Sequence, residues 1–399
     1  MAKACPTPQP LRMVIGTLVL LTLLFMMTFL GRFVFPPLFP TMSDDIHLGP
    51  GQAGSLFLLA AIAAWVGSLG AGLVSSRINH RGTLLVSVFG FAAALLGAYF
   101  ANSVWAFRAV FIVLGLCFGL HLPSSVATIT ATVRREDWGR ALSIQQLGPP
   151  AGLVAAPLIA VAILHWFSWP TVLISVAVLT AVVGLAFWLF TGGVGAFPGD
   201  PPSPSMVKPV LANRSFWVMI LVFTLGMGAQ VGVYTMLPLY LTTERDMTTS
   251  TANTLLGLAN IAPLVTAFFS GWVTSRIGEK RAIGIFVFLT GIVTVLVGVL
   301  SGVALTICVV LMAALAVCIL PPAFAALSRI VQPTYRSLAT ALGPPTAFVF
   351  GGGLLPTGLG YLGQATSFSL GIIVTGAVIT IGSCAAFLLH LLTDLEEGC

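Results

Sequence analysis

Runs of apolar residues follow one another along nearly the whole chain, and each is about 20 residues long, enough to cross a hydrocarbon core of roughly 30 Å as an α-helix. Charged residues make up only 7% of the sequence, against roughly a quarter in soluble domains. The runs are too long and too uniformly apolar for the alternating strands of a membrane barrel. The sequence therefore predicts an all-α integral membrane protein.

Three landmarks occur twice, in the same order and at nearly the same offset. They are residues 72–81 and 271–281, the Leu-Pro pairs at 122–123 and 320–321, and the segments 140–150 and 336–345. Such a repeat indicates a duplicated chain with two homologous halves.

The apolar runs predict twelve transmembrane helices in two pseudo-symmetric six-helix bundles. The first bundle, residues 1–190, has helices at 11–39, 51–75, 82–101, 104–132, 141–164 and 170–190, with an acidic loop at 40–50. A Gly-, Pro- and Ser-rich linker covers 191–214. The second bundle, residues 215–399, has helices at 215–241, 250–274, 282–301, 303–330, 337–362 and 367–392.

The basic residues set the predicted orientation, because Lys and Arg near the ends of spans stay on the cytoplasmic side. With both termini cytoplasmic, one face collects Lys3, Arg12, Arg77, Arg81, Arg134, Arg135, Arg140, Lys208, Arg214, Arg276, Lys280, Arg281, Arg329 and Arg336. Arg245 alone falls in an opposite loop. The net charge of +6 therefore reflects topology and indicates no nucleic-acid partner. We expect a multi-pass protein of a bacterial cytoplasmic membrane.

The basic turns resemble the loop between helices 2 and 3 of the major facilitator superfamily, Gly-x-x-x-Asp-Arg-x-Gly-Arg-Arg. The first copy matches at Gly72, Arg77 and Arg81, and the second at Gly271, Arg276, Gly278, Lys280 and Arg281. Ser76 and Ser275 replace the usual Asp, and Asn79 replaces a Gly.

The resemblance implies the fold of these secondary transporters, in which two halves rock about a substrate site near the bilayer midplane. It also implies a cytoplasmic gate with Arg77, Arg81, Arg276 and Arg281, although the missing Asp leaves the family's charge relay incomplete. The segments 31–40 and 45–54 are similar to the organic-anion branches of the family.

Acidic residues are confined to predicted loops and tails. Glu244 and Asp246, with Asp44 and Asp45, are expected at the outer mouth as solvated side chains. Transporters that move a neutral sugar together with a proton, or that move a cationic drug, usually need a buried acidic residue. The interior therefore favours an anionic cargo.

Arg32 lies about two thirds of the way along the first helix, where an always-charged side chain is costly against lipid. An anionic substrate held by its bidentate donors is one interpretation. The alternative is that the side chain reaches the outer surface or pairs with helix-end carbonyls. Arg108, close to the outer end of its helix, favours reaching the surface.

His121 lies in the middle of the fourth helix, where a neutral imidazole can be buried and can take a proton near neutral pH. We assign it a substrate-binding or proton-coupling role, against the alternative of a simple hydrogen bond to a neighbour. A weak acid that brings its own proton would make this role unnecessary.

Neutral polar residues complete the predicted substrate site. Gln230 and Tyr234 are one helical turn apart and share a face, and Asn260 lies on the next helix with Asn253. They are suited to orienting a ligand, or to hydrogen bonding between helices.

The hypothesis from the sequence is a monomeric secondary transporter of a small organic anion, similar to a monocarboxylate, coupled to protons. An exporter of hydrophobic neutral or cationic compounds is the alternative, and a sensor or membrane enzyme is a third possibility. The sequence contains no nucleotide-binding loop, metal-ligand spacing or catalytic cluster. We therefore expect no cofactor, no metal and no enzymatic activity.

Overall fold

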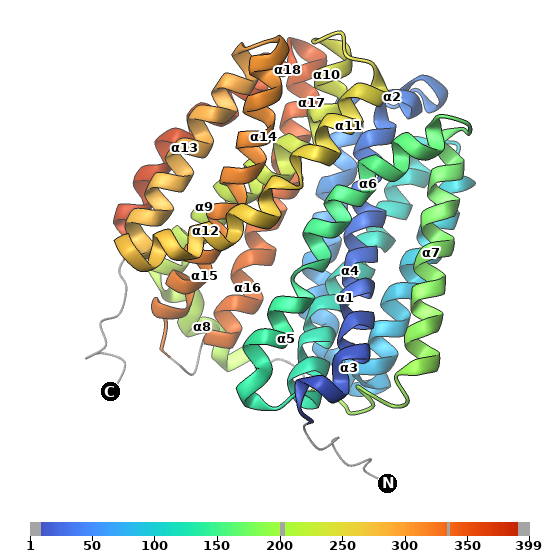
Figure 1. Ribbon diagram of the computed structural model, residues 1–399, viewed down its shortest axis with the longest axis vertical. Coiled ribbons are helices and arrows are strands. Elements are labelled where there is room, and N and C mark those ends of the chain that lie inside the picture. Colours follow the sequence, from blue (N-terminus) through green and yellow to red (C-terminus); the bar gives the residue numbers. More distant parts are fainter. Residues whose placement is uncertain (1–8, 200–203, 333–335, 390–399) are drawn as a thin grey trace. The chain divides into compact units, whose positions relative to one another are not determined.

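The computed structural model describes residues 9–199, 204–332 and 336–389, and every regular element in this part of the chain is a helix (Figure 1). This confirms the all-α class. Lys3 and the last residues of the predicted twelfth helix lie outside the described residues.

The first half of the chain contains seven α-helices and a short 3-10 turn. They are α1 (Leu11–Phe33), α2 (Phe35–Ile46), α3 (Pro50–Tyr99), α4 (Val104–Thr132), η1 (Arg135–Asp137), α5 (Trp138–Gln145), α6 (Gly148–Leu164) and α7 (Trp169–Phe190). The predicted fourth helix has the observed bounds. The predicted acidic loop at 40–50 is wrong over much of its length, because α2 continues to Ile46.

The second half repeats this plan with more interruptions. Its elements are α8 (Pro204–Ala212), α9 (Arg214–Met227), η2 (Gly228–Val233), α10 (Tyr234–Thr243), α11 (Thr249–Ala259), α12 (Ala262–Ile277), α13 (Glu279–Val299), α14 (Gly302–Cys318), α15 (Leu320–Arg329), α16 (Arg336–Val349), η4 (Phe350–Leu354), α17 (Leu355–Ala365), α18 (Phe368–Gly382) and η5 (Ser383–Leu388). Helix α8 lies within the segment that the sequence predicts to be an irregular linker.

Among the described residues, ten helical segments are long and apolar enough to span a membrane, and one further bent pair passes the same test. The 50-residue helix α3 contains two of the predicted spans, joined at Asn79. Counting α3 twice and the bent pair once gives the predicted twelve spans.

The contacts divide the chain into two compact units. Unit 1 is Met1–Met42 with Ile62–Pro202, and unit 2 is Ser43–Ala61 with Ser203–Cys399. The start of α3 belongs to unit 2 because its backbone touches α17: a Cβ atom on Gly54 would lie 2.3 Å from the carbonyl oxygen of Pro356. The predicted domains at 1–190 and 215–399, with their linker, stay a prediction.

The two basic turns have the same backbone geometry. Asn79 has a φ of +61° and Gly278 a φ of +81°. Asn is one of the few residues other than Gly that tolerates this left-handed region. Its Oδ1 atom accepts a hydrogen bond of 2.8 Å from the Gly82 amide, so Asn79 begins the next span as well as turning the chain.

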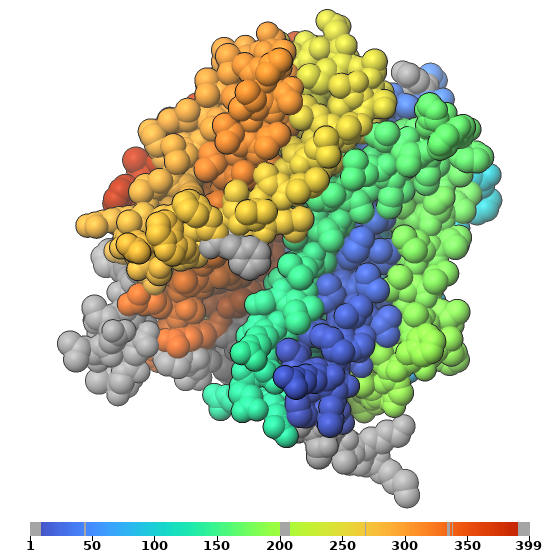
Figure 2. Space-filling model, viewed as in Figure 1, coloured from blue at the N-terminus to red at the C-terminus, as the bar shows by residue number. Residues whose placement is uncertain are grey.

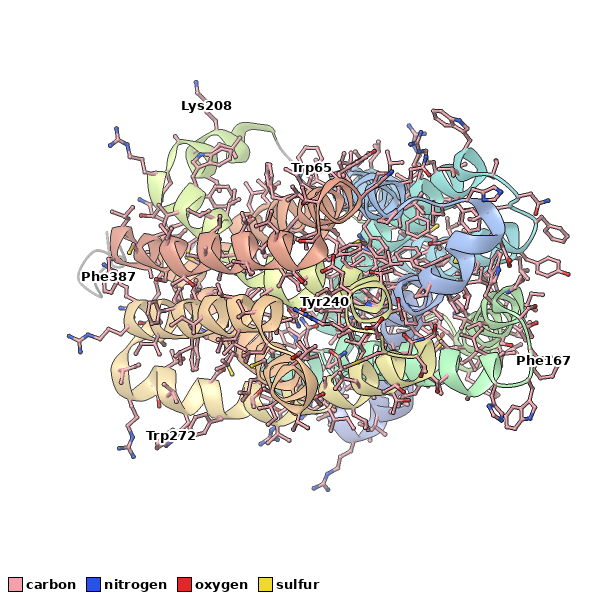
Figure 3. All side chains as sticks on the ribbon, turned by 90° about the horizontal axis from the view of Figure 1, so that it is seen from above. Trp65, Phe167, Lys208, Tyr240, Trp272 and Phe387 are labelled. Carbon is pink, nitrogen blue, oxygen red and sulfur yellow. The ribbon has the colours of Figure 1, made fainter. Side chains whose placement is uncertain are left out.

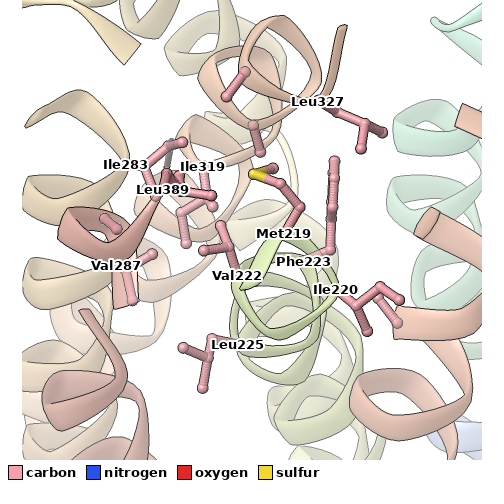
Figure 4. Close-up of a cluster of buried hydrophobic side chains, with 14 of the residues drawn as sticks. Met219, Ile220, Val222, Phe223, Leu225, Ile283, Val287, Ile319, Leu327 and Leu389 are labelled. Carbon is pink, nitrogen blue, oxygen red and sulfur yellow. The ribbon is translucent and has the colours of Figure 1, made fainter. Parts of the chain in front are cut away.

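Each unit has its own apolar core. In unit 2, Met219, Phe223 and Ile319 belong to a cluster of buried side chains contributed by α9, α13, α15 and neighbouring elements (Figure 4). In unit 1, α6 and α7 pack on α1, as the space-filling view shows for one face (Figure 2). These cores hold α1, α4 and α9 in place. Helices α1 and α4 carry Arg32 and His121, and α9 leads into η2, which carries Gln230.

Two of three proline pairs lie where their helices are interrupted. Pro149 and Pro150 follow the break between α5 and α6, and Pro321 and Pro322 begin α15. The third pair, Pro344 and Pro345, lies inside α16, and that span changes instead to a π-turn at η4. There the Gly351 backbone approaches α9 so closely that a Cβ atom would lie 2.6 Å from the Thr224 carbonyl oxygen.

The loop after α10 is fixed to the helices around it, which corrects the expectation of a solvated Glu244. The Glu244 carboxylate accepts hydrogen bonds from the Phe368 amide and from the amide (2.9 Å) and hydroxyl (2.6 Å) of Ser369. The neighbouring Arg245 donates to the hydroxyl of Tyr240 (2.8 Å) and the carbonyl of Gly298 (2.8 Å). Glu244 therefore caps the first turn of α18, where a negative charge is also favoured by the helix dipole.

We predict that Glu244→Gln lowers the free energy of unfolding by about 1 kcal/mol, because it removes the charge from this cap. Denaturation of the purified protein in detergent measures the difference. Asp246→Asn is the matched control, since Asp246 is exposed in the same loop and Asn tolerates its positive φ. Equal stability of Glu244→Gln and Asp246→Asn would contradict the capping role.

Candidate functional site

Arg32 is buried in unit 1, in the last turn of α1. Its side chain is 1% exposed, although it is among the largest in the chain. The guanidinium carbon lies 5.9 Å from the ring centre of Phe33 and 5.5 Å from that of Phe118 on α4. These contacts are within cation–π distance, so aromatic faces stabilise a positive charge held inside the helix bundle.

An aromatic cluster, Phe25, Phe29, Phe33 and Phe118, joins Arg32 to the middle of α4. Phe25, Phe29 and Phe33 are spaced four residues apart on α1 and therefore share one face of that helix. The ring centres of Phe29 and Phe118 are 5.2 Å apart, which links α1 to α4. Arg32 lies at one end of this cluster.

His121 lies at the other end of the cluster. Its ring stacks on Phe25 with the centres 5.5 Å apart and the planes 11° from parallel. The side chain has no exposed surface, and neither ring nitrogen has a hydrogen-bond partner among the described residues. A buried imidazole without a partner loses its hydrogen bonds to water, so its ring nitrogens are available to a polar group that enters the site.

Ser124 is a candidate site residue that the sequence analysis missed. It lies one turn beyond His121 on α4 and is fully buried, and its hydroxyl has no hydrogen-bond partner in the part of the chain that the structure describes. Its spacing of three residues from His121 was the signal available in the sequence. The hydroxyl of the next residue, Ser125, does have a partner, because it accepts a hydrogen bond of 2.6 Å from the Gln145 side chain on α5.

In unit 2, the structure brings Gln230, Tyr234 and Asn260 together around one small cavity of about 10 Å³. Apolar side chains, among them Leu237 and Met312, form much of the remaining wall. The Tyr234 hydroxyl and the Asn260 amide share a hydrogen bond, and the Asn260 amide also donates to the Leu256 carbonyl at 2.8 Å. The cavity therefore offers oriented neutral hydrogen-bonding groups in an apolar surround.

Gln230 belongs to the π-turn η2, which the sequence analysis did not predict. Such a turn inserts a residue into a helix and often occurs at functional sites. Close packing explains its place here: a Cβ atom on Gly232 would lie 2.4 Å from the carbonyl oxygen of Gly351 in the other π-turn. Asn253 is fully buried on α11 and does not line this cavity.

The four arginines predicted for a cytoplasmic gate differ in their surroundings. Arg81 is bound within unit 1, where its guanidinium donates to the Trp188 carbonyl at 2.6 Å near the end of α7. Arg276 lies over the ring of Trp272, 5.1 Å from its centre, while Arg77 and Arg281 are exposed. The sequence analysis missed an ion pair of 3.0 Å beside the second turn, between Glu279 and Arg329.

Thus Arg32 and His121 form one group of candidate residues in unit 1, and Gln230, Tyr234 and Asn260 form a second in unit 2. Among the described residues, no cluster of three or more His, Cys, Asp or Glu side chains is suited to a metal ion.

Comparisons with known proteins agree with this architecture. The family model described as Major Facilitator Superfamily matches residues 21–263, and one described as MFS/sugar transport protein matches residues 197–331. Two relatives are sugar efflux transporter A of Dickeya chrysanthemi and multidrug resistance protein MdtG of Proteus mirabilis. The first is 25% identical over 65% of this chain and 67% of its own length. The second is 26% identical over 60% of this chain and 60% of its own length.

Solved structures show the same fold at low sequence identity. An inward-facing, occupied bacterial homologue of the human lysosomal transporter Spinster has a TM-score of 0.81 at 16% identity, covering 96% of this chain and 97% of its own. The nucleoside transporter NupG has a TM-score of 0.75 at 14% identity, covering 94% and 99%. The family match over more than half of the sequence, the helical spans and this fold lead to one conclusion: the chain is a multi-pass membrane transporter that belongs to the major facilitator superfamily.

Proposed function

We propose that the chain is a secondary transporter that moves a small organic anion, similar to a monocarboxylate, by alternating access. The observation that carries this proposal is the burial of Arg32 against the aromatic rings of unit 1, at 1% exposure. A guanidinium stays protonated and presents a planar set of donors that matches a carboxylate.

The distribution of negative charge supports the same interpretation. The described carboxylates lie at helix ends or in connecting turns, and they are Asp45, Glu136, Asp137, Glu244, Asp246 and Glu279. A buried guanidinium with carboxylates confined to the ends of helices favours an anion over a cation as the cargo.

His121 is the proposed proton carrier. It is buried at the far end of the aromatic cluster from Arg32, and within the described structure its two ring nitrogens have no hydrogen-bond partner. Protonation gives the imidazole a second N–H donor and a positive charge. Binding of the anion compensates the cost of that buried charge, so anion and proton bind cooperatively.

The cavity of unit 2 is proposed to orient the neutral part of the cargo. Gln230, Tyr234 and Asn260 supply donors and acceptors without net charge. We further propose that the protein acts as a monomer in a bacterial cytoplasmic membrane, with the basic turns and both termini on the cytoplasmic side. The arginines of these turns would then help to close the cytoplasmic gate.

Efflux of a sugar or of a hydrophobic compound is the second candidate function. The names of two relatives, a sugar efflux transporter and a multidrug resistance protein, favour it, and so does the neutral cavity in unit 2. The test measures efflux of a labelled disaccharide. Efflux that is unchanged in Arg32→Gln and lower in Tyr234→Phe would establish this candidate.

We predict that Arg32→Gln lowers the uptake of labelled lactate or pyruvate into proteoliposomes at least about tenfold, since a charge-assisted pair is typically worth 1.5–3 kcal/mol. Arg32→Lys should keep part of the activity, because it keeps the charge and loses only the planar geometry.

Arg108→Gln is the control for this prediction. Arg108 lies near the start of α4, with its guanidinium carbon 4.3 Å from the ring centre of Trp105, and that Trp is 75% exposed. Loss of a surface arginine should leave anion uptake unchanged. If Arg32→Gln transports every accepted anion as well as the parent protein does, the anchor role is wrong.

We predict that His121→Gln keeps anion exchange and loses the coupling of transport to protons. The variant should still exchange labelled for unlabelled anion across the vesicle membrane. It should lose the accumulation that an imposed pH gradient drives in the parent protein, because its amide takes no proton near neutral pH.

Measuring exchange and gradient-driven uptake on the same vesicles distinguishes a loss of coupling from a loss of folding. Ser125→Ala is a useful comparison, since Ser125 is buried on the same helix and bound to Gln145. Unchanged gradient-driven accumulation in His121→Gln would remove the proton role.

A further inference from the structure

An open apolar groove of about 500 Å³ runs along unit 2 between α9, η4, α17 and α18. It is separate from the cavity around Tyr234. Its walls include large apolar side chains that are 39% to 52% exposed, namely Trp217, Leu221, Phe350, Leu354, Leu362 and Val374. In a protein that spans a bilayer, such a surface is suited to an acyl chain.

One end of this groove is basic. Arg214, Trp217 and Leu221 are three and four residues apart on α9, so they form a single stripe that leads from an exposed guanidinium into the groove. The Trp217 indole N–H donates to the Leu211 carbonyl at 2.8 Å, which fixes α8 at this end. Lys208 lies one turn earlier on α8, and its side chain extends away from the ribbon (Figure 3).

The duplicated half of the chain provides a comparison within the same molecule. Arg12, Ile15 and Val19 on α1 have the same spacing as Arg214, Trp217 and Leu221 on α9. In unit 1, α7 packs against α1, whereas in unit 2 the matching span contacts α9 more through its last part, η5, than through α18. The space left between α9 and α18 forms part of the groove.

We propose that this groove is a binding site for an anionic phospholipid. One acyl chain fills the apolar walls, and the phosphate lies between Arg214 and Lys208. The positive charge selects the headgroup, since basic residues at a membrane surface attract anionic lipids and a guanidinium binds phosphate in a bidentate manner. Trp217 has the amphipathic ring that proteins place at the boundary between headgroups and acyl chains.

The test uses the full-length protein, purified in detergent and incubated with equal amounts of dioleoylphosphatidylglycerol and dioleoylphosphatidylcholine. Native mass spectrometry counts the lipids that stay bound. We expect preferential retention of the anionic lipid, and a drop of about tenfold or more in that preference for the double variant Lys208→Gln and Arg214→Gln.

A second variant tests the acyl-chain part of the site. Gly358 lines the groove, and a Cβ atom there meets nothing within 4 Å, so a side chain can start at this position and Gly358→Phe is designed to occupy the groove. It should reduce the retention of both lipids. The charge-matched control is Arg12→Gln, which should retain the anionic lipid as the parent protein does.

Three outcomes would overturn the proposal: equal retention of the two lipids by the parent protein, an equal loss of preference in Arg12→Gln, or unchanged retention in Gly358→Phe. The first two would mean diffuse attraction to a basic surface, and the third would mean that the groove holds no acyl chain. None of these readings depends on which solute the protein transports.

Discussion

The burial of a permanent positive charge is the constraint on which the proposed mechanism depends. Arg32 lies inside unit 1 at 1% exposure, and the rings of Phe33 and Phe118 face its guanidinium. Aromatic contact stabilises the charge only in part, because a desolvated cation costs several kcal/mol in a membrane interior. Binding of an anion is therefore expected to offset part of this free-energy cost.

The second unit complements this charge with neutral chemistry. Tyr234 and Asn260 are hydrogen-bonded to each other beside Gln230, and the walls around them are apolar. In the proposed mechanism, charge recognition belongs to one half of the duplicated chain and recognition of the neutral part of the cargo to the other.

Much of the fold can be predicted from the sequence, because long apolar runs and basic turns are local signals. The span at 104–132 is observed with the predicted bounds, and Ser103 caps its start. The end of the first predicted helix, at residue 39, was wrong because a proline usually stops a helix, whereas α2 has Pro40 inside it and continues to Ile46. The Glu244 cap and the π-turns were missed because they depend on residues more than 100 positions away. Within the candidate site, the roles of Arg32 and His121 stay predictions from the sequence, and the aromatic cluster that joins them was not predicted.

The most direct test of the account compares pairs of solutes that have the same shape and differ only in charge. Lactate and lactamide, or benzoate and benzamide, can be measured as competitors for uptake of a labelled anion by the parent protein in proteoliposomes. The account predicts that the carboxylate competes at least about tenfold better than its amide, since a charge-assisted pair with a buried guanidinium is worth 1.5–3 kcal/mol. Equal competition by the two members of each pair, or stronger competition by the amide, would contradict it.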